Sequence, residues 1–360
     1  MPHFLRKLDW ILIISALLLV GIGLLSLYSS SIGKGDFSQF RKQAIFAGIG
    51  IFSMFLFSSL NYRIFKNDSY LILAFYFICL IGLSGLFFMA PEIRGVKSWY
   101  KLGPISLDPS EFTKIALLFF LAKYFSSRHI ELYRVYHILL SGLYLFFPVA
   151  LIAIQPNMGS ALILVFLWLV ILIISGIKLK LFLSLCLSGL LMLALSWSFL
   201  LQDYQKERIV GFVLPSSDPL GINWNQTQAK IAIGSGGILG QGLGNGSQTQ
   251  YGFLPESQTD FIFSAIAEEF GLVGIIILLL LIIITLSRII KIAINAQSNF
   301  PRLFVSGFAV ILMTQVFINI GMNLGIMPVI GIPLPLVSYG GSSLVITFIG
   351  LGVTQSIKRG

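Results

Sequence analysis

The stretch FIFSAIAEEFGLVGIIILLLLIIITLS, residues 261 to 287, has two adjacent carboxylates in its first third and no charge after them. A helix needs about 20 apolar residues to cross the hydrocarbon core of a bilayer, so this stretch predicts a transmembrane helix. Similar stretches recur along the chain, at approximately 10–30, 43–61, 70–90, 110–125, 138–154, 159–176, 180–200, 261–287, 303–322 and 342–357. The sequence therefore predicts an all-α polytopic membrane protein with ten transmembrane helices.

The composition agrees with this fold class. Hydrophobic residues make up 56% of the chain and charged residues 11%, and the mean hydropathy is +0.92, which is more apolar than a soluble domain tolerates. No polar stretch has the size of a domain, so we expect one integral membrane domain over residues 1–360. An even number of spans leaves both termini on one side. That side holds about twice as many Lys and Arg residues as the other, which predicts that both termini are cytoplasmic. The same topology accounts for the net charge of +10 without a nucleic-acid partner.

Three predicted outward segments are rich in Gly, Pro and polar residues: 91–114, 201–260 and 323–343. The second is a long extracytoplasmic loop between the seventh and eighth spans. The third is mostly apolar, but its prolines prevent a regular helix. Non-helical backbone at membrane depth must be covered by protein or line a water-filled cavity. The third segment is therefore either a re-entrant segment before the last span or an irregular loop on the outer surface, and the sequence leaves both open.

The glycine-rich run GSGGILGQGLGNG, residues 234–246, has two interpretations. Its backbone N–H groups could hold a phosphate, but it has neither the Lys-Ser/Thr pair of a P-loop nor a G-x-G-x-x-G spacing. A flexible connection is the favoured interpretation. The chain has no nucleotide-hydrolysis motif, which argues against an ATP-driven pump.

Ionisable residues at the edge of a span are candidates for function because they are costly there. Glu111 and Lys114 stand three residues apart on one helical face, where they can pair with each other or bind a ligand. Asp260 ends the sequence Ser257-Gln-Thr-Asp260, which fits a helix capping box, and spacing alone favours that role. The alternative is that Asp260 acts as a general base toward a hydroxyl group.

Several cations near the predicted outer face could neutralise a phosphate or diphosphate: Arg94, Lys97, Lys101, Lys114, Arg208 and Lys230. No Asp-x-Asp motif specifies a metal-bound diphosphate. The two cysteines, Cys79 and Cys186, lie in different spans without a metal-ligand spacing. The residues themselves indicate an enzyme or a transporter of lipid phosphates.

Four long motifs carry a more specific resemblance. They are GVKSWYKLGPISLDPSEFTKIA (95–116), QPNMGSAL (155–162), NQTQAKIAIGSGGILGQGLGNGSQTQYGFLPESQTDFIFSAIAEEFGLVG (225–274) and NIGMNLGIMPVIGIPLPLVSYGGSS (319–343). With them the chain resembles the SEDS family (shape, elongation, division and sporulation). The element GIPLP, residues 331 to 335, and the compact length are more similar to the RodA branch than to the FtsW branch.

The resemblance implies a ten-span peptidoglycan glycosyltransferase that polymerises lipid II at the outer face of the bacterial cytoplasmic membrane. It also implies a class B penicillin-binding protein as partner, whose transpeptidase crosslinks the strands, and for the RodA branch a role in cell elongation and rod shape. The sequence neither demands nor excludes a divalent cation, so no cofactor is assigned.

The resemblance also implies site residues. The family's essential acid falls in the motif LPESQTDF, residues 254 to 261, and corresponds to Asp260, the expected catalytic residue. The expected residues of the active cavity are Trp99, Glu111, Lys114 and Arg208.

Two positions depart from the family pattern. Asp108 stands where the family usually has Gln, and it adds a negative charge near the cavity. Asn157 stands where the family has Asp in its Q-P-D-x-G motif, and an amide cannot act as a base or as a charged partner for a cation.

Two alternative functions remain open from the sequence. A transporter of lipid-linked precursors would need coupling-ion residues near mid-span, for which Glu268 and Glu269 are the candidates. A membrane scaffold that recruits the penicillin-binding protein would need no chemistry at Asp260.

Overall fold

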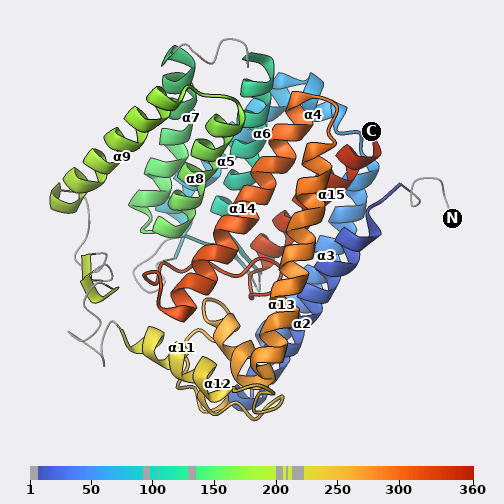
Figure 1. Cartoon of the computed structure of the whole chain (residues 1–360), viewed down its shortest axis with the longest axis vertical. Helices are drawn as coiled ribbons and strands as arrows, with labels where there is room; N and C mark the ends of the chain where they lie inside the picture. The colour runs from blue at the N-terminus through green and yellow to red at the C-terminus, as the bar shows by residue number, and fades with distance from the viewer. Residues whose placement is uncertain are drawn as a thin grey trace.

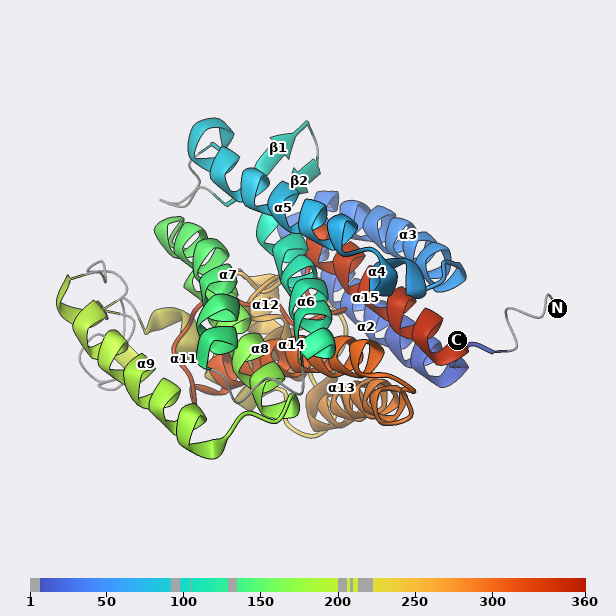
Figure 2. The ribbon, with the colours of Figure 1, turned by 90° about the horizontal axis from the view of Figure 1, so that it is seen from above.

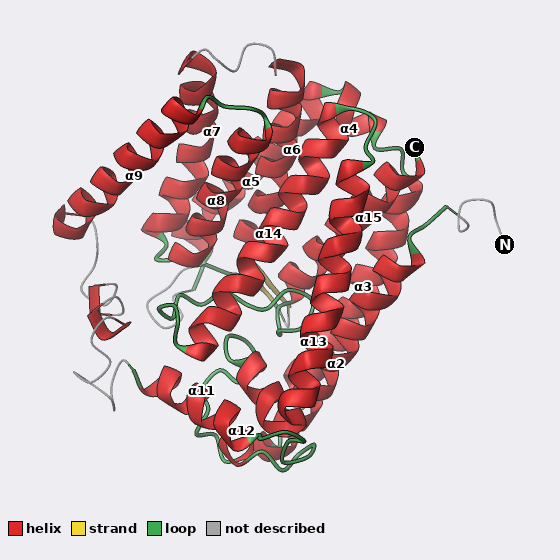
Figure 3. Ribbon diagram, in the orientation of Figure 1, coloured by secondary structure: helices red, strands yellow, loops and turns green. Residues whose placement is uncertain are grey.

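The computed structural model describes residues 7–91, 98–103, 105–128, 135–199, 206–207, 210–212 and 223–360, and most of them are helical (Figure 3). A long helix occupies each range predicted as a span: α2 (Trp10–Lys34), α3 (Ser38–Ser59), α5 (Ser69–Met89), α6 (Pro109–Arg128), α7 (Val135–Ile154), α8 (Met158–Ile174), α9 (Leu179–Phe199), α13 (Ile262–Ile294), α14 (Asn299–Leu324) and α15 (Gly341–Arg359). Shorter helices are α4 (Arg63–Asn67), α11 (Trp224–Ser235) and α12 (Ser247–Gln250).

The length of the helices and their exposed apolar side chains are those of a multi-pass membrane protein. In the described part of the chain, six helices are long and apolar enough to cross a bilayer: α2, α3, α5, α7, α13 and α14. Large apolar side chains stay exposed on their outer faces, such as Phe52 at 69%, Ile81 at 71% and Ile283 at 60%. A soluble protein rarely exposes so much contiguous apolar surface, whereas lipid is a suitable solvent for it.

The helix α14 runs through the middle of the bundle, where it packs against α6, α8 and α13 (Figure 1). The rings of Phe119 on α6 and Phe304 on α14 lie 4.5 Å apart between centroids. At Gly307 the helices approach so closely that a Cβ atom would lie 2.4 Å from Leu118 Cδ1. Around this centre, α3 packs along α15 and α2 along α13, while α9 lies at the edge of the bundle (Figures 1 and 2).

The beginning of α2 and the end of α15 meet at one end of the bundle. The Asp9 N–H donates to Gln355 Oε1 over 2.8 Å, and Gln355 Nε2 donates to the Asp9 carbonyl over 3.1 Å. The beginning of α2 and the end of α15 therefore lie on the same side of the bundle (Figure 1).

The outward segment 91–114 contains a small hairpin, so the expectation of an all-α chain is wrong at this point. The strands β1 (Tyr100–Leu102) and β2 (Ile105–Leu107) pair antiparallel, with Tyr100 opposite Leu107. Gly103, with φ of 63°, supplies the left-handed conformation that the turn requires. The Tyr100 hydroxyl donates to the Gly82 carbonyl over 2.7 Å, which fixes the hairpin beside α5 (Figure 2).

The helix α13 is interrupted at Gly271, with φ of 64° and ψ of −163°. The glycine-rich run packs into this break. Carbonyls of Glu268 and Glu269 accept from the N–H groups of Gln241 and Gly242 over 2.9 and 3.0 Å. The interpretation of the run as a flexible connection is therefore wrong. At Gly236 and Gly240 the main chain lies directly against the main chain of α13, where a Cβ atom would lie 2.0 and 2.1 Å from the carbonyl oxygens of Ala267 and Glu269.

We expect Gly271→Ala to destabilise the protein by about 1 to 3 kcal/mol. A Cβ atom at Gly271 would lie 2.3 Å from the Gly240 backbone nitrogen, and the backbone conformation is strained for any other residue. Thermal unfolding of the purified protein in detergent measures the loss. The control is Gly189→Ala in α9, where a Cβ atom meets nothing within 4 Å; an equal effect of the two substitutions would contradict the close packing at the break.

The segment between α14 and α15 is not helical, in agreement with its prolines. It runs between the helices of the bundle, and its side chains Ile332, Leu334 and Val337 are at most 2% exposed. The first residues of the predicted segment 323–343 still belong to α14. The carbonyl of Ile332 accepts from Asn319 Nδ2 over 2.8 Å.

Candidate active site

Asp260 lies directly before α13, but it does not belong to a capping box. The helix begins at Ile262, and the N-cap position is Phe261, whose side chain makes no cap hydrogen bond. A capping box would have required Ser257 at the N-cap and Asp260 within the first turn. The Ser257 hydroxyl makes no hydrogen bond with any described residue, so the capping box favoured by spacing alone is wrong.

Two asparagines of α14 hold the main chain at Asp260. Asn319 Nδ2 and Asn323 Nδ2 both donate to the Asp260 carbonyl, over 3.0 and 2.9 Å. The Asn323 Oδ1 atom accepts from the Ser264 N–H and hydroxyl over 3.2 and 2.6 Å. These asparagines were not among the predicted site residues, although two amides spaced i, i+4 within an apolar span are a detectable signal.

The segment between α14 and α15 covers the motif 254–261 from the other side. The Ser338 hydroxyl donates to the Thr259 carbonyl over 2.6 Å, and the Tyr339 N–H donates to the Gln258 carbonyl over 2.9 Å. Within the segment, a Cβ atom at Gly331 would lie 3.7 Å from Asp260 Oδ2. The partly exposed Asp260 carboxylate therefore faces the main chain of the segment at Gly331.

Strained backbone occurs in both of these segments. Glu256 in the motif and Leu336 in the facing segment have φ of 47° and 66°. Non-glycine residues adopt such values at a cost, and they are concentrated at sites where geometry serves function. The two outliers lie in the two segments that meet beside Asp260.

Glu111 and Lys114 form an ion pair at the beginning of α6. Lys114 Nζ lies 2.7 Å from Glu111 Oε1, and the two residues are 2% and 7% exposed. The pairing expected from the i, i+3 spacing is confirmed. Because a lysine ammonium has three donors, Lys114 retains donors for a further acceptor.

Asp108 directly precedes α6, and its Oδ1 atom accepts from the Ser110 N–H over 2.8 Å. Burial and the nearby charge of Glu111 raise the pKa of Asp108 to about 6, from its usual value of 3.8. The added carboxylate is therefore disfavoured in its charged form, and it titrates much closer to neutrality than an ordinary aspartate.

A raised pKa in the folded protein means that folding is accompanied by proton uptake between the two pKa values. We therefore expect the wild-type protein to gain stability relative to Asp108→Asn as the pH falls from about 7 to about 4. The measurement is the difference in melting temperature between the two proteins across this range. Asp36→Asn is the control, because hydrogen bonds from Ser38 lower the pKa of Asp36 and its contribution is lost as the pH falls. A pH-independent difference at Asp108 would contradict the raised pKa.

Asn157, the second departure from the family pattern, is the N-cap of α8. Its side chain accepts from the Ser160 N–H over 3.3 Å, a role for which asparagine is as suitable as aspartate. The Ser160 hydroxyl lies 3.3 Å from that of Ser110, which connects this cap to the beginning of α6. The two departures, at Asp108 and Asn157, are therefore joined through one pair of serines.

The beginning of α8 also contacts the segment beside Asp260. A Cβ atom at Gly159 would lie 2.9 Å from the Ile330 carbonyl and 2.7 Å from Ile332 Cγ1. The motifs around Asp260, Glu111 and Asn157 thus converge on one region, the end of the bundle where the segment 325–340 passes between α8, α13 and α14.

The other expected site residues are placed as follows. Trp99 is partly buried directly before β1. Arg208 lies outside the described residues, as do Arg94 and Lys97. Lys101 and Lys230 are exposed. Lys230 crosses the end of α14, where a Cβ atom at Gly325 would lie 2.3 Å from its Nζ atom.

Glu268 and Glu269 have structural partners. The Glu268 carboxylate accepts from the N–H groups of Gln248 and Thr249 over 2.7 and 3.0 Å, which stabilises the beginning of α12. Glu269 Oε1 accepts from the hydroxyl of Ser29 on α2 and from Gln250 Nε2. Within the described residues, no group of three or more His, Cys, Asp and Glu side chains could hold a metal ion.

The sequence motifs that meet in this region are those of a known family. The family described as "Cell cycle protein", FtsW/RodA/SpoVE, matches residues 9–360. The chain belongs to the FtsW/RodA/SpoVE family. Peptidoglycan glycosyltransferase MrdB of Escherichia coli K12 is 41% identical over 282 residues, which are 78% of this chain and 76% of that protein. Stage V sporulation protein E of Bacillus subtilis is 35% identical over 363 residues, 98% of this chain and 97% of that protein.

Solved structures of the family share the fold. A chain from "Structural coordination of polymerization and crosslinking by a peptidoglycan synthase complex" superposes with a TM-score of 0.84 at 33% identity, over 98% of both chains. The rod shape determining protein RodA of Thermus thermophilus superposes with a TM-score of 0.73 at 32% identity, over 98% of this chain and 97% of that one. The predicted SEDS family membership is thereby confirmed.

Proposed function

We propose that the protein polymerises lipid II into β-1,4 glycan strands at the outer face of the bacterial cytoplasmic membrane during cell elongation. It is a peptidoglycan glycosyltransferase, the activity that its MrdB and FtsW relatives carry in their names. In this proposal the whole chain acts as one membrane unit with ten transmembrane helices and cytoplasmic termini. The segment 325–340 is then a re-entrant type of segment at the outer side.

In the proposed reaction Asp260 removes the proton from the 4-hydroxyl of the acceptor GlcNAc. The oxygen attacks C1 of the donor MurNAc, the bond from C1 to the diphosphate oxygen breaks, and undecaprenyl diphosphate leaves with the electron pair. Inversion at C1 gives the β-1,4 bond. No covalent enzyme intermediate is needed, because a diphosphate leaves readily once its charge is balanced.

Lys114 is the described cation best suited to that balancing. Glu111 holds its ammonium in position, and its remaining donors can bind an oxygen of the diphosphate. Arg208 would supply a second cation and Trp99 a wall of the active cavity. A divalent cation is compatible with this scheme but is not required by it.

The fixed position of Asp260 is the single observation that carries the proposal. Its carbonyl accepts two side-chain amide hydrogen bonds, and its carboxylate faces the main chain at Gly331. A general base must be held within hydrogen-bond reach of the proton that it removes, and such anchoring provides this.

The proposed partner is a class B penicillin-binding protein, whose transpeptidase would crosslink the new strands. Support comes from the similar chain in the peptidoglycan synthase complex described for polymerization and crosslinking. The transporter alternative is less well supported at Glu268, because the Glu268 carboxylate is held by α12, whereas one oxygen of the buried Glu269 carboxylate accepts from Ser29 and Gln250 and the other has no partner among the described residues.

The experiment uses the purified protein with its partner and labelled lipid II in detergent, where transport has no meaning. Glycan ladders that persist in penicillin are the expected result. The absence of polymer across several partner proteins and divalent cations would favour the transporter or scaffold alternatives over the polymerase.

A further inference from the structure

A cavity of about 140 Å³ opens at the end of the bundle that carries both chain ends. It lies between the beginnings of α2 and α14 and the ends of α13 and α15. Four charged side chains line it: Asp9, Arg288, Lys291 and Lys358. The last residue, Gly360, also lines the cavity, and its α-carboxylate is a second negative charge. Three positive charges therefore face two negative ones, which leaves an excess of positive charge. This cavity is far along the bundle from the motifs around Asp260, so the polymerase chemistry does not account for it.

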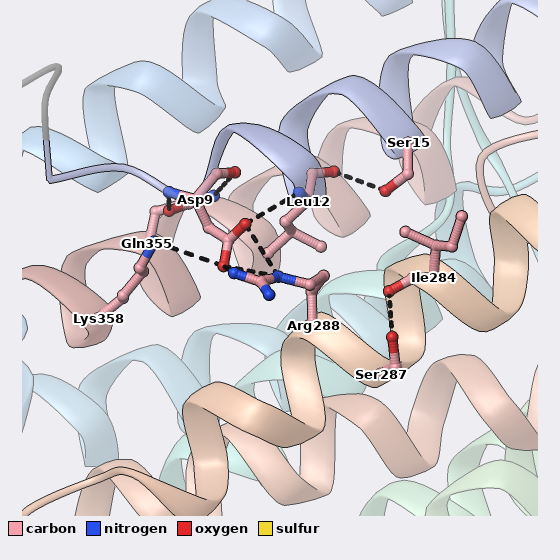
Figure 4. Close-up of polar contacts among 8 residues, drawn as sticks. All are labelled: Asp9, Leu12, Ser15, Ile284, Ser287, Arg288, Gln355 and Lys358. Carbon is pink, nitrogen blue, oxygen red and sulfur yellow. Dashed lines mark hydrogen bonds and ion pairs between the residues drawn. The ribbon is translucent and has the colours of Figure 1, made fainter.

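Asp9 is the fixed anion of the cavity (Figure 4). It is 2% exposed, and its carboxylate accepts from Arg288 Nε and Nη2 over 3.0 and 2.6 Å and from the Leu12 N–H over 3.2 Å. Burial by itself would raise the pKa of Asp9, but the Arg288 hydrogen bond, the Leu12 N–H and the charge of Lys358 outweigh burial and hold the pKa below its usual value. Asp9 and Arg288 thus form a neutral, doubly hydrogen-bonded pair.

Asp9 is the one acidic side chain among the described residues of the cavity lining that is available to balance Arg288 and the two lysines. Lys358 Nζ lies 3.4 Å from Asp9 Oδ2, an oxygen that Arg288 already occupies at 2.6 Å. Lys291, one helical turn after Arg288, makes no ion pair with any residue that the structure describes. A cavity wall with two ammonium groups and a guanidinium, in excess of its carboxylates, is suited to an anion.

We propose that this cavity binds a phosphate group, carried by the headgroup of an anionic phospholipid or by a soluble phosphate. A cavity of this volume exceeds the roughly 30 Å³ that one water molecule occupies in the liquid several-fold, so it can admit a phosphate group. Lys291 and Lys358 are the residues that contact the anion. Asp9 and Arg288 position them by holding the ends of α2, α13 and α15 together.

The residues around the cavity combine positive charge with exposed apolar side chains, as binding of an anionic phospholipid requires. Three more cations directly follow residues that line it, namely Arg63, Arg302 and Arg359. On α13, Ile290 and Ile294 directly precede the cavity residues Lys291 and Asn295 and are 44% and 74% exposed. If the phosphate of a phospholipid bound in the cavity, the acyl chains of that lipid would lie against these apolar side chains. Cations beside a membrane-facing apolar surface are the usual arrangement for recognition of anionic lipids.

The test compares full-length wild-type protein with the double variant Lys291→Gln and Lys358→Gln, which leaves the Asp9–Arg288 pair intact. Lys180→Gln is the matched control, because Lys180 is an exposed lysine at the beginning of α9. One arm titrates phosphatidylglycerol into the detergent-purified protein, with phosphatidylcholine for comparison. A second arm titrates inorganic phosphate against sodium chloride of equal ionic strength. Native mass spectrometry and the melting temperature report binding.

We expect the wild type and Lys180→Gln to retain phosphatidylglycerol and the double variant to bind it about tenfold or more weakly. Stabilisation by inorganic phosphate alone, lost in the double variant, would support the phosphate site and assign it to a soluble anion. Equal binding by all three proteins, or no response to either probe, would overturn the proposal. Circular dichroism checks that the double variant is folded. The single variant Lys358→Arg keeps the positive charge and should bind phosphatidylglycerol more tightly than the double variant does.

Discussion

Asp260→Asn should lower the rate of glycan polymerisation by at least about 100-fold, because a general base typically contributes between 10² and 10⁴ in rate. The substitution replaces one oxygen by an amide nitrogen and leaves the main chain unchanged. The hydrogen bonds from Asn319 and Asn323 to the Asp260 carbonyl should therefore persist. We expect the melting temperature and the affinity for lipid II to stay close to those of the wild type.

The measurement is the initial rate of polymerisation of labelled lipid II, together with thermal unfolding of the same preparations. Asp36→Asn is the matched control, since Asp36 is an exposed aspartate before α3 that hydrogen-bonds only locally, to Ser38. A variant at Asp260 that forms ladders at the wild-type rate would remove this residue from the chemistry. A variant that loses its fold would instead show that the carboxylate is structural.

Much of the fold could be predicted because a bilayer imposes a simple rule on sequence. Long apolar runs must be helices there, and the helices of the structure begin and end close to the predicted runs. The break at Gly271 could not be predicted, because it depends on main-chain contact with Gly240, about thirty residues earlier. The sequence stays apolar on both sides of Gly271, since these residues are buried or face lipid, and so the hydropathy pattern does not reveal the break.

The candidate site shows the same division between local and non-local signals. The Glu111–Lys114 pair follows from helical spacing, and the structure contains it. The capping box at Ser257 also follows from spacing, but α13 begins later, because the turn 255–260 is held by Asn319, Asn323 and Ser338 from distant parts of the chain. Local sequence patterns indicate which structures a segment could adopt in isolation. Here the tertiary hydrogen bonds decide where the helix begins.

Those distant hydrogen bonds lead to the second large expected effect, at Asn323. Asn323→Leu is nearly isosteric but removes the donor to the Asp260 carbonyl and the acceptor for Ser264. Buried polar groups left without partners cost about 1 to 3 kcal/mol each, so the turn that carries Asp260 should shift or loosen. A displacement of about 1 Å at a catalytic group can lower a rate about 100-fold, and we expect a loss of this order in kcat.

The effect should fall on kcat rather than on KM, because Asn323 holds the catalytic turn and is fully buried away from substrate. Asn319→Leu should act similarly, and combining the two should cost less than the sum of the separate effects, since both amides hold one carbonyl. The control is Gln315→Leu, a buried polar residue on α14, one turn before Asn319 and two turns before Asn323, that donates no hydrogen bond to Asp260. If Gln315→Leu lowered kcat as much as Asn323→Leu, the loss would reflect general damage to α14. If only the asparagine variants lose activity while their melting temperatures stay above the assay temperature, the position of Asp260 is what polymerisation requires.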